Sequence, residues 1–151
     1  MHTAFIRAAA LTAFVALPLA ASAASKPFPA LAGWDHTTPQ LATPAPGRGY
    51  DTYKKDDQQV TVLSDTGLVY ADIVGAVKKN VSDNGIKTSI DRDFTCGTKH
   101  AHEIEMILGS TVYRQLIVDD NPGVTKVTYM RTQGSTPAAD ALGALTSYCG
   151  T

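Results

Sequence analysis

The chain has 151 residues, a formal net charge of −1 at pH 7 and 44% hydrophobic residues, a length and composition that suit a single domain. It has no basic run beyond Lys54–Lys55 and Lys78–Lys79. The electrostatic footprint of nucleic-acid binding is therefore missing, and we expect neither a nucleic acid nor another polyanion as partner.

Residues 1–24 are predicted to be a cleavable secretory signal. Arg7 provides the positive start, residues 8–16 are apolar apart from Thr12, and Ala21–Ser22–Ala23 has the small-x-small pattern that a signal peptidase needs. A membrane anchor is the alternative, but the apolar run is shorter than the ~20 residues that span a bilayer. We therefore expect a secreted or periplasmic protein with no stable membrane span after cleavage.

Residues 25–49 are expected to form a Pro-rich extended arm or linker, followed by a single domain over residues 50–151. Five prolines fall in this arm, and that density does not suit a helix or a central strand. The arm carries Trp34, the only tryptophan of the chain. This side chain either anchors the arm to the domain or contacts a partner.

The spacing of apolar residues predicts the elements of the domain. Alternation predicts strands and a 3.6-residue spacing predicts helices; the segment 111–118 fits a strand better than its alternative, a short helix. In chain order we expect a strand at 58–64, a helix at 67–83, strands at 86–94, 103–108, 111–118 and 124–131, and a helix at 138–148. This β-α-β-β-β-β-α order indicates an α+β fold, with an antiparallel sheet of four to five strands and two helices packed on one face.

The two cysteines, Cys96 and Cys149, are predicted to form one disulfide. Export places them where disulfides persist, and their number is even. Such a bridge would stabilise the fold by about 4 kcal/mol. Two free thiols, or Cys96 as a metal ligand, are the alternatives.

His100 and His102 are candidate ligands for a transition metal. In an extended segment, residues two apart project to the same face, and two imidazoles on one face suit such a metal. Glu103 and Glu105 fall on the opposite face from His102 and cannot complete that site without a bulge. We predict no cofactor apart from this possible metal, and two solvated histidines are the plainer interpretation.

A charged cluster supplies the other candidate contacts. Glu103 and Glu105 share one strand face, and Arg114 and Arg131 are expected on neighbouring strands of that face. Cross-strand charge pairing is the plain interpretation, a grip on an anionic ligand is the sharper one, and acid–base catalysis by the two carboxylates is a further alternative. With Trp34, these residues are the candidate contacts for a ligand or partner.

The missing catalytic motifs favour a binding function. The sequence has no Gly-x-Ser-x-Gly, Cys-x-x-Cys or His-Glu-x-x-His pattern. We therefore expect a small exported module, more a binder than an enzyme, for a protein or small molecule outside the cytoplasm. A periplasmic transition-metal-binding protein using His100 and His102 is the first alternative, and a small hydrolase with carboxylate acid–base residues is the second.

Overall fold

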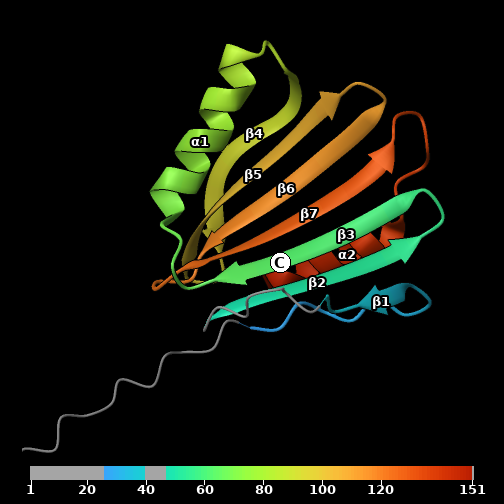
Figure 1. Cartoon of the computed structure of the whole chain (residues 1–151), viewed down its shortest axis with the longest axis horizontal. Helices are drawn as coiled ribbons and strands as arrows, with labels where there is room; N and C mark the ends of the chain where they lie inside the picture. The colour runs from blue at the N-terminus through green and yellow to red at the C-terminus, as the bar shows by residue number, and fades with distance from the viewer. Residues whose placement is uncertain (1–25, 40–46, 151) are drawn as a thin grey trace, which may run out of the picture.

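The structure, a computed structural model, describes residues 26–39 and 47–150. Its strands form one antiparallel sheet in the order β1-β2-β3-β7-β6-β5-β4 (Figure 1). The strands are β1 (Asp35–Thr37), β2 (Arg48–Lys55), β3 (Gln58–Asp65), β4 (Lys87–Cys96), β5 (Lys99–Leu108), β6 (Thr111–Asp119) and β7 (Val124–Thr132). The helices are α1 (Tyr70–Asp83), between β3 and β4, and α2 (Ala139–Tyr148), at the end.

The expected sheet of four to five strands, with both helices on one face, is wrong. The sheet has seven strands, and the two helices cover opposite faces (Figure 1). Val74 of α1 packs against Ile117 on one face, whereas Ala141 of α2 packs with Val127 on the other. Apolar spacing predicts that each helix buries a stripe, but it carries no information about which face of the sheet receives it.

The two additional strands come from the region around the expected arm. The segment Arg48–Lys55 is too polar to show an apolar alternation, yet it pairs with β3 along its whole length through the tight turn at Asp56–Asp57. Asp56 adopts a positive φ of 53°, which such a turn requires. β1 then adds three residues at the outer edge of β2, where a short, Pro-flanked strand is tolerated. Pairing with a neighbour, rather than the local pattern, makes both segments strands.

The larger core lies between the sheet and α2. Strand residues such as Val60, Leu116 and Val127 meet Leu145 and Tyr148 of the helix. Phe28, Leu31 and Trp34 of the arm extend this core. α2 and the arm therefore cover much of one face, whereas Arg92 of β4 on that face stays exposed.

The smaller core lies under α1. Val74 is the buried residue of this helix, and it packs with Ile117 and Val124. The turn between β6 and β7 closely approaches the end of β3, which leads to this helix: a Cβ added to Gly123, whose φ is +99°, would lie 2.5 Å from the carbonyl oxygen of Asp65. Only glycine fits this approach.

The predicted disulfide between Cys96 and Cys149 is confirmed. It joins the end of β4 to the residue after α2, and both cysteines are buried. The bridge therefore holds the C-terminal end of α2 against the β4 side of the sheet.

The predicted signal at residues 1–24 lies outside the described residues. Within residues 26–39 and 47–150, no helix is long and apolar enough to cross a membrane.

Candidate functional site

A cavity of about 130 Å³ lies where the open part of the sheet meets α2. Three strands and the helix build it, because the antiparallel register places Arg92 of β4 opposite Glu103 of β5, and Glu103 opposite Leu116 of β6. Its lining residues are Arg92, Phe94, Glu103, Arg114, Leu116, Leu145, Thr146 and Cys149. The cavity thus has a charged wall, made by Arg92, Glu103 and Arg114 of the strands, and an apolar wall, made by Phe94, Leu116 and Leu145.

The charged wall is a triad of one carboxylate and two guanidinium groups. Arg92 donates from Nε (2.8 Å) and Nη2 (2.5 Å) to Oε2 of Glu103. Arg114 donates from Nε (2.8 Å) and lies with Nη2 2.6 Å from Oε1 of the same carboxylate. The side chain of Glu103 is 9% exposed, so it is held between the two arginines. We call these three residues the Arg–Glu–Arg triad.

The charge state of Glu103 follows from this setting. Burial raises the pKa of its carboxyl group, but the hydrogen bonds and positive charges of Arg114 and Arg92 outweigh burial and hold the pKa below its usual value. The group is therefore ionised at neutral pH. A carboxylate in this state is poorly matched to general acid–base work, which needs a pKa near the working pH.

Both guanidinium groups keep donors for a further partner. The bonds to Glu103 use Nε and Nη2, and within the described part of the chain Nη1 of neither arginine makes a hydrogen bond. The triad has two positive charges and one negative charge. Arg92 also lies over the ring of Phe94, 5.5 Å from its centroid, which limits how freely its guanidinium moves. The triad therefore offers oriented N–H donors and a net positive charge.

The other two charged candidates lie on the same face but do not line the cavity. Glu105 faces Arg114 across the β5–β6 pair, yet its Oε1 accepts a hydrogen bond from Ser89 instead (2.7 Å). Arg131 of β7 donates to the carbonyl oxygen of Ser135 (3.2 Å). The sequence-predicted cluster therefore divides, and only Glu103 and Arg114 come together.

Trp34 lies away from the triad and fastens the arm. Its side chain is buried, and its Nε1 donates to Oδ2 of Asp140 on α2 at 2.8 Å. The indole has little surface left for a partner.

The histidine pair is separated by burial. His100 is exposed, whereas His102 is fully buried and its Nδ1 lies 2.9 Å from Oδ1 of Asp93. Across the described ranges, no three His, Cys, Asp or Glu side chains gather as a metal-ligand group. The predicted metal site therefore gains no geometric support.

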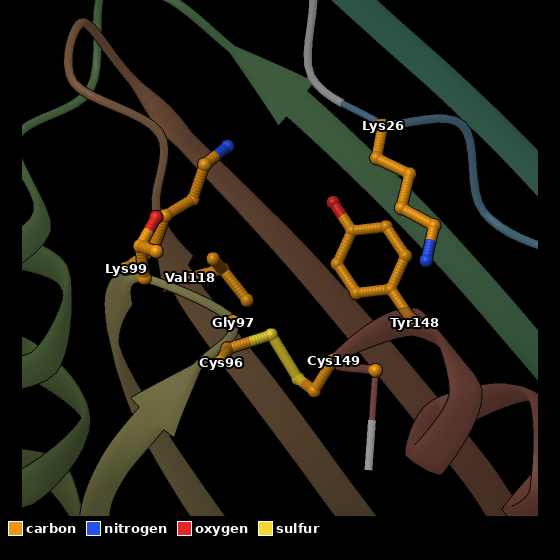
Figure 2. A pocket seen from close by; sticks show the side chains of 9 residues that line it. Lys26, Cys96, Gly97, Lys99, Val118, Tyr148 and Cys149 are labelled. Atoms are coloured by element: carbon orange, nitrogen blue, oxygen red, sulfur yellow. A yellow bond between two sulfur atoms is a disulfide. The ribbon is translucent and has the colours of Figure 1, made fainter.

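A second cavity, of about 300 Å³, lies beyond the disulfide, and Cys149 lines both cavities. Figure 2 shows the bridge below the ring of Tyr148, with Lys26 and Lys99 on opposite sides of that ring in this view. Lys99 pairs with Asp120 (2.6 Å), and Lys26 donates to a backbone carbonyl oxygen (3.2 Å). Both ammonium groups are thus already engaged, which makes this larger cavity the weaker candidate for an anion.

The prediction from sequence missed Arg92, although a signal for it was present. Gly97–Thr98 connects β4 to β5 as a two-residue turn that pairs Cys96 with Lys99. Counting back along that hairpin places Arg92 directly opposite Glu103. Arg114 is not directly opposite Glu103, because the register places Leu116 there. The two side chains meet diagonally across the strand pair, and only the side-chain positions in the structure reveal that contact.

Comparison with known proteins adds little to this geometry. No protein-family model matches the sequence, and no curated protein matches it. Among solved structures the chain is similar to the crystal structure of PA94, a protein of unknown function from Pseudomonas aeruginosa, with 17% identity and a TM-score of 0.43 over 76% of this chain and 77% of that chain. A likeness this distant says nothing about function, so the interpretation of the site depends on its own contacts.

Proposed function

We propose that this protein is an exported, non-catalytic binding module that takes a carboxylate-bearing ligand at the Arg–Glu–Arg triad. The observation that carries this proposal is that Glu103 holds Arg92 and Arg114 beside a cavity, while Nη1 of each arginine makes no hydrogen bond to any described residue. Guanidinium groups are the side chains best suited to bind a carboxylate through paired hydrogen bonds.

The shape of the cavity supports a small apolar body on that carboxylate. Its volume of about 130 Å³ has room for a few water molecules, and so for a carboxylate with a short branched stem. Phe94, Leu116 and Leu145 supply the apolar wall against which such a stem packs. Pockets of this kind combine mostly apolar walls with a few oriented polar groups.

Two features support a site of action outside the cytoplasm. The N-terminal sequence has the three parts of a secretory signal. Cys96 and Cys149 form a disulfide, and disulfides persist in oxidising compartments outside the cytoplasm.

Titration of the cleaved protein with 3-methylbutanoate, followed by isotope-edited NMR, tests the proposal. We expect chemical-shift changes confined to the cavity residues, and no such changes with the neutral 3-methylbutanamide. Arg114→Gln should weaken binding about 10-fold, because it removes one charged donor pair. The matched control is Arg131→Gln, on the same face but outside the cavity, which should bind as the wild type does. Equal binding of the acid and the amide, or no binding of either, would overturn the proposal.

A further inference from the structure

Among residues 26–39 and 47–150, no strand pairs with the outer edge of β4. It is the last strand of the sheet, ten residues long, and β5 is its single neighbour. Within the described part of the chain, no backbone hydrogen bond joins its outer edge to a loop or helix. Most of its side chains are exposed; α1 packs its buried Val74 against Ile117 of β6 and reaches β4 through Lys78, which lies 3.3 Å from Asp93. The edge can therefore accept another extended chain.

The same strand carries one wall of the candidate site. Arg92 and Phe94 of β4 line the triad cavity, and the side chain of Arg92 is 62% exposed. A residue directly opposite Arg92 on an added strand would have its Cβ about 5 Å away, on the same face. An acidic side chain at that position would bring its carboxylate to the open edge of the guanidinium.

The charges on the edge define the partner further. Asp91 lies on the opposite face from Arg92, with Oδ1 3.4 Å from Nε2 of the buried His102. Its side chain is still 42% exposed and contacts no Lys or Arg among the described residues, so it favours a basic residue facing it. Asp93 on that face already contacts Lys78 of α1 (3.3 Å) and His102, so a neutral residue suits its position. Apolar residues suit the positions facing the half-buried Ile90 and Phe94.

A second copy of this chain does not fit these requirements. Two β4 edges that pair antiparallel with their equivalent faces on the same side would align residues of the same parity. In the registers that overlap the two strands most, Asp91 of one copy would face Asp91 or Asp93 of the other, and like charges across a strand pair are unfavourable. The bulge between Thr88 and Ile90 shortens the regular edge further.

We infer that the carboxylate ligand is a side chain of an extended polypeptide that adds to the free edge of β4, with an acidic residue facing Arg92 and a basic residue facing Asp91. This inference rests on the proposed function, because the acidic side chain would use the donors of the Arg–Glu–Arg triad. Main-chain hydrogen bonds to β4 would provide affinity, and the alternating charges would set the register.

A blocked peptide, Thr-Val-Thr-Glu-Lys-Val, tests the inference. Aligned antiparallel from Thr95 to Ile90, it places Glu against Arg92 and Lys against Asp91. Its matched control, Thr-Val-Thr-Lys-Glu-Val, has the same composition with the two charges exchanged. We expect the first peptide to bind about 10-fold more tightly by NMR titration, because exchange turns two attractive cross-strand pairs into repulsive ones. Arg92→Gln should remove most of that preference, whereas Arg131→Gln should keep it.

Backbone methylation separates strand addition from simple charge attraction. Two versions of the first peptide carry N-methyl groups on alternate residues, so that one version blocks the edge facing β4 and the other blocks the outer edge. Strand addition predicts that one version loses binding and the other keeps it. Equal binding of both versions, or of the two charge isomers, overturns the inference. If 3-methylbutanoate still binds in the same samples, the triad remains a carboxylate site; if neither acid nor peptide binds, both proposals fail.

Discussion

Glu103→Gln is the sharpest test of the triad as a structural unit. Glutamine keeps one acceptor oxygen but replaces the other with an amide that points donors at a guanidinium. Water replaces the lost contact at Arg92, whose side chain is 62% exposed, more readily than at Arg114, which is 25% exposed. A buried group left with an unsatisfied charged partner costs about 1–3 kcal/mol, so we expect the free energy of unfolding to fall by about 2 kcal/mol at pH 7. The melting temperature should fall by about 4–8 °C in a chain of this length.

The stability lost in Glu103→Gln should depend on pH, because the pKa of Glu103 is lowered in the folded protein. A carboxyl group whose pKa is lower in the folded state stabilises the protein above its unfolded pKa, about 4.3, and this contribution disappears as the pH falls through the folded pKa. The stability gap between wild type and Glu103→Gln should therefore be full above about pH 5 and close at lower pH. Urea unfolding at several pH values, followed by circular dichroism, measures that gap.

Glu105→Gln is the matched control for this test. Glu105 lies on the same strand and face but accepts one exposed hydrogen bond, from Ser89. Its replacement should change stability by less than about 0.5 kcal/mol. A loss at Glu103 no larger than this, or a gap that stays constant as the pH falls below 4.3, would refute the reasoning about the triad.

Two further predictions concern the frame around the site. Cys96→Ala/Cys149→Ala opens a loop with a sequence separation of 53 and should lower the free energy of unfolding by about 4 kcal/mol; wild type reduced with dithiothreitol should match it in urea unfolding, and unchanged stability would contradict the predicted role of the bridge. Gly123→Ala should cost about 2–3 kcal/mol, because its Cβ would strike the backbone 2.5 Å away at a positive φ. In the same assay Gly143→Ala should instead stabilise the protein by up to about 1 kcal/mol, because Gly143 is exposed on α2 with open space around an added Cβ. A Gly123→Ala variant more stable than Gly143→Ala would contradict the close approach of the turn to β3.

Local patterns in the sequence anticipated several elements but not the size of the sheet. Alternation at Gln58–Asp65 and helical spacing at Tyr70–Asp83 correspond to elements of the structure, and Thr111–Asp119 is a strand. β2 (Arg48–Lys55) has too few apolar residues to show such a pattern. Its extended form depends on hydrogen bonds to β3, which a local pattern does not reveal.

The candidate site was predictable in part. Alternation along β5 and β6 placed Glu103 and Arg114 on one face, and the register set by the Gly97–Thr98 turn would have added Arg92. The cavity itself was not predictable, because it needs Leu145 of α2 to cover that face. Nothing in the spacing of α2 residues specifies the strand pair on which the helix lies.

The sequence by itself predicted a secretory signal, which lies outside the described residues, and it correctly paired Cys96 with Cys149. The pairing was predictable because the chain has two cysteines, which leave one intramolecular disulfide to form. Only the tertiary structure decided that the sheet has seven strands, that the helices lie on opposite faces, and that Glu103 bonds to two arginines. These features depend on contacts between residues far apart along the chain. Such contacts form when strand edges pair and helices bury their apolar stripes, and a local pattern of residues does not encode them.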